Sequence, residues 1–109
     1  MRIAVKFYPL EKRSLLKTGY RKVFDIEGRS LLLIVHRDQP FLVENRCGHF
    51  GYPLDEGIIE DDAIVCPQHG ISFDLLTGSI ANRPYENADP IMTFPLVEQD
   101  SMIGVMLGK

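Results

Sequence analysis

The sequence predicts an all-β fold, a small antiparallel sandwich or barrel that carries a hairpin subdomain at about residues 46–84. Short apolar segments of strand length recur along the chain, and turn-forming residues separate them. No segment shows the periodicity of a long amphipathic helix. At 109 residues the chain is long enough for one core and too short for a second, so we expect a single domain over residues 1–109.

The first half of the chain predicts a meander of hairpins. Ile3, Val5 and Phe7 alternate with polar residues, as in a half-buried strand, and we expect Pro9 to end that strand. Further strands are expected at 20–26, 30–37 and 41–44, with turns at 27–29 and 38–40. The apolar run in the second of these segments is continuous, which favours a central strand.

The second half predicts a short hairpin and then a return to strands. Residues 57–59 and 63–65 flank an acidic turn at 60–62, which we expect to be solvated, and the loop at 82–84 is placed to reach back across this region. Strands are expected again at 91–97 and 102–107, and Pro95 predicts an edge position or a bulge in the first of them. His36 is expected to be a surface or hydrogen-bonded scaffold residue.

Charge is distributed unevenly, although the formal net charge is only -3. Residues 1–46 contain ten Lys and Arg against five Asp and Glu, whereas residues 47–82 contain six acidic residues and no Lys or Arg. Two interpretations are open: the charges only solvate the surface, or an acidic surround disfavours an added electron and orients approaching partners. Nucleic-acid binding is not expected, because no basic patch is interleaved with aromatic residues.

The N-terminal residues and the apolar segments carry no expected signal for export or for membrane insertion. Residues 1–17 lack the continuous apolar core of a signal peptide, and no stretch has the length of a membrane span. We therefore expect no membrane association. The chain has two cysteines, and if both belong to a metal site then the cytoplasm is the expected location.

Both cysteines and two of the three histidines lie close together, in the spacing C-x-H-x16-C-x2-H formed by Cys47, His49, Cys66 and His69. A disulfide would leave both histidines unexplained. Spacing alone leaves structural zinc open, because Cys2His2 satisfies a tetrahedral ion. The alternative is a [2Fe-2S] centre in which two histidines replace two cysteines on one iron. The alternation of Cys and His in each loop favours this alternative, since the pair can present two sulfurs to one iron and two nitrogens to the other.

The two loops resemble the binding boxes of the Rieske iron-sulfur family. The family patterns C-x-H-x-G-x-x-L and C-P-x-H-G-x-x-[FY]-[DN] are present at residues 47–54 and 66–74. Thr77-Gly78 and Pro84 are also similar to family features. The resemblance implies one [2Fe-2S] cluster per chain, with the buried iron on Cys47 and Cys66 and the outer iron on His49 and His69.

Departures from the family pattern indicate which branch the chain resembles. High-potential members carry a further cysteine in each loop and hydroxyl groups that donate to cluster sulfurs. This chain has Tyr52 and Gln68 at the cysteine positions, and Ile71 and Phe73 at the hydroxyl positions. It is therefore similar to the soluble, low-potential Rieske ferredoxins of bacterial oxygenase systems.

The resemblance implies a one-electron carrier that is not itself an enzyme and that passes electrons from a flavin-containing ferredoxin reductase to a terminal oxygenase. Two alternatives are the small subunit of a nitrite reductase and a zinc-stabilised interaction module. The residues themselves predict no catalytic site: the carboxylates fall in expected turns, Ser72 has no motif base nearby, and no phosphate-binding loop or flavin signature is present. Gly48, Gly51 and Gly70 are expected to allow close backbone approach around the metal site.

Overall fold

The computed structural model describes residues 5–48, 51–68, 70–82 and 88–108. Its regular structure is β-strand throughout these ranges, apart from one 3-10 turn, η1 (Arg13–Leu15). The all-β prediction is therefore confirmed. No helix in the described ranges has the length and apolar character needed to cross a membrane. The strands are β1 (Val5–Lys12), β2 (Arg21–Ile26), β3 (Arg29–His36), β4 (Gln39–Glu44), β5 (Ile58–Glu60), β6 (Ala63–Val65), β7 (Ser72–Asp74), β8 (Thr93–Phe94), β9 (Leu96–Gln99) and β10 (Met102–Gly108).

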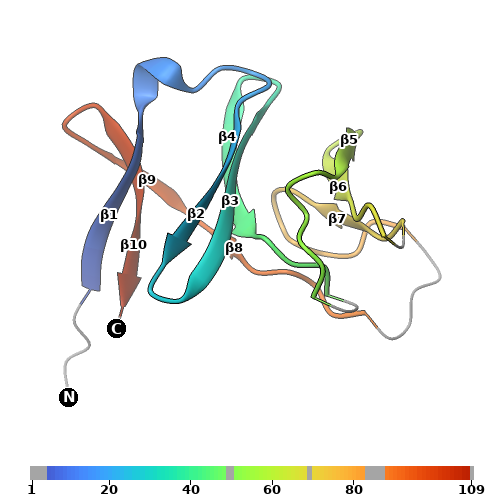
Figure 1. Cartoon of the computed structure of the whole chain (residues 1–109). Helices are drawn as coiled ribbons and strands as arrows, with labels where there is room; N and C mark the ends of the chain where they lie inside the picture. Colours follow the sequence, from blue (N-terminus) through green and yellow to red (C-terminus); the bar gives the residue numbers. More distant parts are fainter. Residues whose placement is uncertain (1–4, 49–50, 69, 83–87, 109) are drawn as a thin grey trace.

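The strands form antiparallel sheets that pack in layers. Their orders are β1-β10-β9, β2-β3-β4-β8 and β5-β6-β7. The four-stranded sheet lies in the middle, with β1, β9 and β10 on one side and β5, β6 and β7 on the other (Figure 1). We call the first two sheets the base, and we call the described residues from 46 to 82 the loop subdomain.

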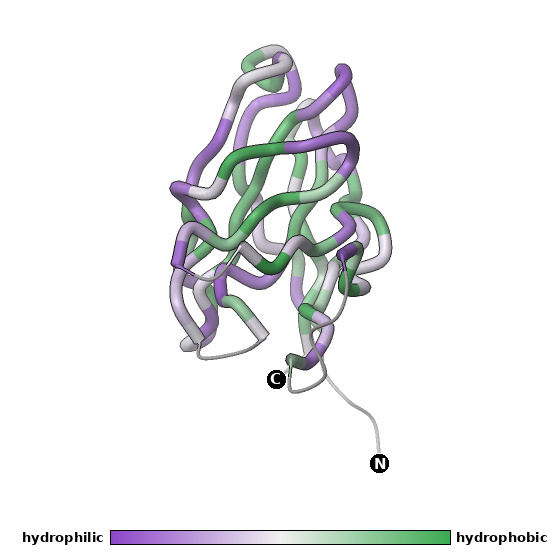
Figure 2. Tube along the Cα trace, turned by 90° about the vertical axis from the view of Figure 1, so that its right-hand side faces the viewer, coloured by the Kyte–Doolittle hydropathy of each residue, from purple (hydrophilic) through white to green (hydrophobic). Residues whose placement is uncertain are grey.

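Strand β3 is apolar at consecutive positions because it is buried on both faces. Leu31 and Leu33 belong to the core inside the base, whereas Leu32 and Ile34 belong to the core shared with the loop subdomain. Successive side chains of a strand point to opposite faces, so both sets of residues must be apolar. Figure 2 shows the hydrophobic positions gathered along the strands and the hydrophilic positions at many of the loops that join them.

Tight two-residue turns join the base hairpins. The turn pairs Glu27-Gly28, Arg37-Asp38 and Asp100-Ser101 all have positive φ, between 52° and 78°. Positive φ at both turn residues is the geometry that matches the twist of the flanking strands. The expected turn at 38–40 is therefore corrected: Gln39 and Pro40 already belong to β4, where they pair with β3.

Strand β1 differs from its prediction in length and in orientation. It continues through Pro9 to Lys12, with an irregular register after Pro9. The proline is tolerated because β1 is an edge strand, where a missing N–H leaves no partner unpaired. Leu10 is buried and Tyr8 packs against the core of the base. Val5 is 56% exposed and Phe7 is half-buried, so the side of β1 expected to face inward is the more exposed one.

The expected strand at 91–97 is divided at Pro95. Strand β8 pairs with β4 in the four-stranded sheet, and β9 pairs with β10 in the three-stranded sheet. Pro95 lies between them, where the chain passes from one sheet to the other. Pro95 is not at a bulge: it lies between β8 and β9, each of which is an edge strand of its sheet, and it marks the change of sheet.

Candidate metal centre

The two cysteines lie in loops that leave the strands of two different sheets. Cys47 follows β4 of the base, and Cys66 follows β6 of the loop subdomain. Their exposed fractions are 0% and 1%, and both belong to the core shared by base and loop subdomain. No disulfide joins them. The predicted ligands His49 and His69 lie outside the described residues.

The two loops have the same backbone hydrogen bonds. The N–H of Cys47 donates to the carbonyl of Tyr52, five residues on, at 2.6 Å, and Gly51 N–H donates back to the Cys47 carbonyl at 2.8 Å. In the second loop Cys66 N–H donates to Ile71 O at 2.7 Å, and Gly70 N–H donates to Cys66 O at 2.9 Å. Each cysteine is therefore held at its own peptide groups by a turn of the same length.

Glycine is required in both turns by the backbone conformation. Gly51 and Gly70 have φ of 76° and 74°, a left-handed conformation that costs other residues roughly 1–2 kcal/mol. Gly48 is required for a different reason, because a Cβ there would lie 1.7 Å from the Asp89 carbonyl oxygen. Gly48 thus allows close approach of the Asp89 backbone, whereas a Cβ at Gly51 would meet no atom within 4 Å, so that the need for glycine at Gly51 is conformational alone.

The segment after residue 87 connects the first loop to the turn beyond the second. Asp89 N–H donates to Gly48 O, and Ile91 N–H donates to Gly78 O, each at 3.0 Å. A Cβ at Gly78 would lie 2.0 Å from the Ile91 carbonyl oxygen. Gly78 of the Thr77-Gly78 pair therefore allows this segment to pack closely against the loop subdomain.

Two asparagines hold the loops through their side chains, and the sequence analysis did not identify either as a site residue. Asn45 Oδ1 accepts from Leu54 N–H at 2.8 Å, which fixes the end of the first loop. Asn82 Oδ1 accepts from Ser72 N–H at 2.9 Å, and its Nδ2 donates to Gly70 O at 2.8 Å. The sequence signal for these two positions is weak, because asparagine is common in turns of every kind.

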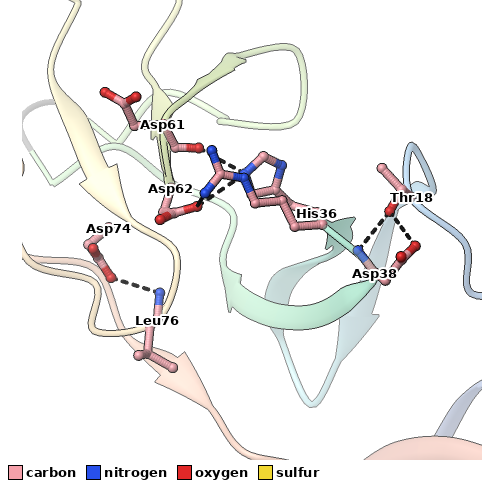
Figure 3. Close-up of polar contacts among 8 residues, drawn as sticks. Thr18, His36, Asp38, Asp61, Asp62, Asp74 and Leu76 are labelled. Carbon is pink, nitrogen blue, oxygen red and sulfur yellow. Dashed lines mark hydrogen bonds and ion pairs between the residues drawn. The ribbon is translucent and has the colours of Figure 1, made fainter.

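Polar contacts tie the base to the hairpin that carries Cys66. His36 Nε2 lies 2.8 Å from Asp61 O and 3.3 Å from Asp62 Oδ1 (Figure 3). Arg37 Nη1 lies 3.2 Å from the same Asp62 carboxylate. His36 is thus a hydrogen-bonded scaffold residue, as predicted. The acidic turn is exposed to solvent, as expected, and the base also contacts it at two residues.

A second contact between base and loop subdomain comes from β2. Arg21 Nη1 donates to Asp55 O at 2.8 Å and to Gly57 O at 2.6 Å. Both carbonyls belong to the chain between the first loop and β5. Basic side chains of the base therefore reach into the acidic segment, and this accounts for part of the charge separation seen in the sequence.

The exposed side of the two loops is hollowed by a shallow groove of about 390 Å³. It is lined by residues of both loops: Tyr52, Pro53, Asp55, Glu56, Pro67 and Gln68. The lining combines apolar rings with two carboxylates, and the described residues from 47 to 82 include no Lys or Arg. This side of the loop subdomain is therefore acidic.

The surroundings of the cysteines fit an iron-sulfur cluster. Two buried thiols on matched loops, which no disulfide joins, are the soft ligands that iron-sulfur clusters take. Ile71 and Phe73 are both 0% exposed and present no hydroxyl toward this core. Among the described residues, no group of three or more His, Cys, Asp or Glu side chains is arranged to hold a metal ion.

Comparison with known proteins agrees with the structure. The Rieske [2Fe-2S] domain family matches residues 6–97. The 3-phenylpropionate/cinnamic acid dioxygenase ferredoxin subunit of Photorhabdus laumondii is 37% identical over 93 residues, which cover 84% of each chain.

Solved structures show the same fold. The Sphingomonas yanoikuyae B1 ferredoxin superposes with a TM-score of 0.77 at 25% identity, covering 92% of this chain and 97% of its own. A chain from the complex of reduced oxygenase and oxidized ferredoxin in carbazole 1,9a-dioxygenase superposes with a TM-score of 0.78 at 26% identity, covering 91% of both chains. With its two matched cysteine loops and a family match over most of its length, this chain belongs to the Rieske [2Fe-2S] domain family.

Proposed function

We propose that one [2Fe-2S] cluster per chain is held by Cys47, His49, Cys66 and His69, with the cysteines on the buried iron and the histidines on the outer iron. The observation that carries this proposal is the pair of identically bonded loops, each with a cysteine buried in the same core. When bound, the cluster accepts and releases one electron. Neutral imidazole ligands reduce the negative charge on one iron, which makes it the better electron acceptor.

The chain is then a one-electron carrier and an electron-transfer component, not itself an enzyme. We place it between a flavin-containing ferredoxin reductase and a terminal oxygenase. Relatives named as dioxygenase ferredoxin subunits, and a similar chain solved in a complex of oxygenase with ferredoxin, support this role over that of a nitrite reductase small subunit. The family match argues against the zinc-stabilised interaction module.

The same proposal places the chain in the cytoplasm as one domain over residues 1–109, with residues 46–84 as its cluster-binding part. Two buried thiols that must stay reduced suit a reducing compartment. The shared core supports a single domain, because Leu32 and Val43 of the base pack with Cys47, Cys66 and Phe73 of the loop subdomain. Removing either part would expose these apolar residues.

The contact surface for electron transfer is expected at the tips of the two loops. We expect a partner to contact Pro67 and Gln68, which are exposed there, and also Phe50 and Pro84-Tyr85, which lie outside the described residues. A carrier must dissociate quickly, so a small contact is suited to turnover. The exposed Glu56 lines the same groove as Pro67 and Gln68. The exposed Glu60 lies further along the loop subdomain, in β5, and would act on a partner at longer range.

Electron delivery to a purified terminal oxygenase, measured over a series of salt concentrations, tests this role. Gln68→Glu adds a charge at the contact and should slow delivery at every salt concentration. Glu60→Lys should change mainly the association rate and its dependence on ionic strength. We choose Glu60 over the neighbouring Asp61 for this substitution, because Asp61 has a φ of 55° and its carbonyl contacts His36. Unchanged delivery by Gln68→Glu, with an unchanged midpoint potential, would place the electron exit elsewhere.

A further inference from the structure

The Asn82 side chain continues the hydrogen bonding along β7, next to the backbone hydrogen bond between Ala81 and Ser72. Ala81 N–H donates to Ser72 O at 2.8 Å, and Ile80 forms a bridge with Phe73, so residues 80–82 run beside β7. The Asn82 side chain then bonds Ser72 N–H and Gly70 O, at 2.9 and 2.8 Å. One amide therefore holds the chain on both sides of Ile71.

The residues on both sides of these bonds are connected directly to Cys66. Ile71 O accepts from Cys66 N–H at 2.7 Å, and Gly70 N–H donates to Cys66 O at 2.9 Å. The bond from Ser72 N–H to Asn82 fixes the peptide group whose carbonyl, Ile71 O, accepts from Cys66 N–H. The bond to Gly70 O holds the residue whose own N–H donates to Cys66 O. A change at Asn82 therefore reaches Cys66 through two hydrogen bonds.

We propose that Asn82 is a positioning residue that sets the reduction potential of the centre by fixing the second ligand loop. This inference rests on the proposed cluster-binding role. Hydrogen bonds to the cluster sulfurs, and the groups that orient the ligands, tune the potential of iron-sulfur sites. An amide is needed at this position because it supplies one donor and one acceptor together, whereas a carboxylate supplies acceptors alone.

The test compares Asn82→Ala, Asn82→Asp and Thr18→Ala as anaerobically purified holo-proteins. Thr18 is a matched control, because its hydroxyl also makes two hydrogen bonds, with the Asp38 carboxylate at 2.9 Å and with Asp38 N–H at 2.7 Å (Figure 3). These bonds belong to the base. Thermal unfolding, protein-film voltammetry and EPR of the reduced state are measured for each variant.

Both Asn82→Ala and Thr18→Ala should unfold at a lower temperature than the parent protein. Asn82→Ala alone should change the EPR g values and lower the ratio of reduced to oxidised protein about tenfold at a fixed applied potential, a shift of about 59 mV for one electron. Asn82→Ala replaces one neutral side chain by another, so an added charge cannot cause this shift of the potential. Asn82→Asp should shift the ratio further in the same direction, because the carboxylate adds negative charge and cannot donate to Gly70 O.

Three results would overturn the inference in distinguishable ways. An Asn82→Ala protein with lower thermal stability but the parent potential and EPR signal would limit Asn82 to a structural role. An equal shift of potential in Thr18→Ala would show that general loosening is the cause. A parent protein that binds no iron would instead overturn the proposed function on which the inference rests. If Asn82→Ala loses its iron, Asn82→Ser is measured in its place. A serine that keeps one of the two hydrogen bonds should shift the midpoint potential less than alanine does, in the same direction.

Discussion

The base and the loop subdomain of this protein are stabilised in different ways. Strands of the base such as β1, β3 and β10 contain seven or eight residues and pair along continuous backbone ladders. Strands β5, β6 and β7 contain three residues each. The loop subdomain depends instead on side-chain amides, on glycines against which other backbone segments pack, and on a core that it shares with the base. Local pattern is enough to specify most strands of the base, whereas the loop subdomain needs contacts between distant parts of the chain.

Substitution of a proposed iron ligand should give the largest difference between the two regions, because it should loosen the loop subdomain and leave the base folded. We expect Cys47→Ser and His69→Ala to abolish iron binding and to loosen the loop subdomain, because its strands are only three residues long and metal binding is commonly coupled to folding. The amides of β3 should keep their protection against hydrogen exchange. Iron analysis and exchange measured by mass spectrometry test this. A variant with full iron content and the parent spectrum would show that the substituted residue is not a ligand.

Substitution of one glycine in each region by alanine should give the next largest difference, measured as the loss of stability. In Gly48→Ala the new Cβ would lie 1.7 Å from the Asp89 carbonyl oxygen, and backbone cannot move aside as a flexible side chain can. Overpacking costs typically about 1–3 kcal/mol, and we expect the top of that range or more. Gly28→Ala, in a base turn with φ of 78° and no atom within 4 Å of the Cβ, should cost roughly 1–2 kcal/mol.

Unfolding in urea gives the free energies for both glycine variants. The base variant serves as the control for backbone conformation, because it strains a turn without creating a clash. Equal destabilisation by the two substitutions would contradict the claim that the loop subdomain depends on close backbone packing.

A hydroxyl added beside the second loop should change the potential more than the stability. Phe73 is fully buried in the core that contains both cysteines. If the Phe73→Tyr hydroxyl donates to a sulfur, a bond worth about 1.5–3 kcal/mol raises the midpoint potential by roughly 65–130 mV. Phe24→Tyr in the base is the matched control and should leave the potential unchanged. Voltammetry that finds the same potential in both variants would show that position 73 does not reach the sulfurs.

The smallest expected effect is a loss of stability at alkaline pH that arises in the base. Burial, then the hydrogen bond to Glu11, raises the pKa of Tyr20 to about 12, from an ordinary value of 10.0. A raised pKa in the folded state stabilises the protein below pH 10, and this contribution is lost as the pH rises toward 12. The unfolding free energy should therefore fall between pH 10 and 12, and Tyr20→Phe should reduce that fall. An identical pH dependence in the variant would remove Tyr20 as the cause.

The sequence was sufficient to predict most of the base and the identity of the loops. Continuous apolar residues at 31–35 predicted the central strand, because a strand buried on both faces cannot alternate. The orientation of β1 was not predictable from alternation, since apolar residues occur on both of its sides and only the pairing with β10 decides between them. Asn82 was equally hidden, because its partners Gly70 and Ser72 are brought to it by the hairpin between them.

The most direct test of the whole account is the metal content and EPR spectrum of the parent protein purified without oxygen. Two buried cysteines on matched loops, with a histidine in each loop of the sequence, predict two irons and two sulfides per chain, a coloured protein, and an EPR signal that appears on reduction by one electron. A colourless, EPR-silent protein that contains zinc would contradict the account and would support the zinc-stabilised module instead.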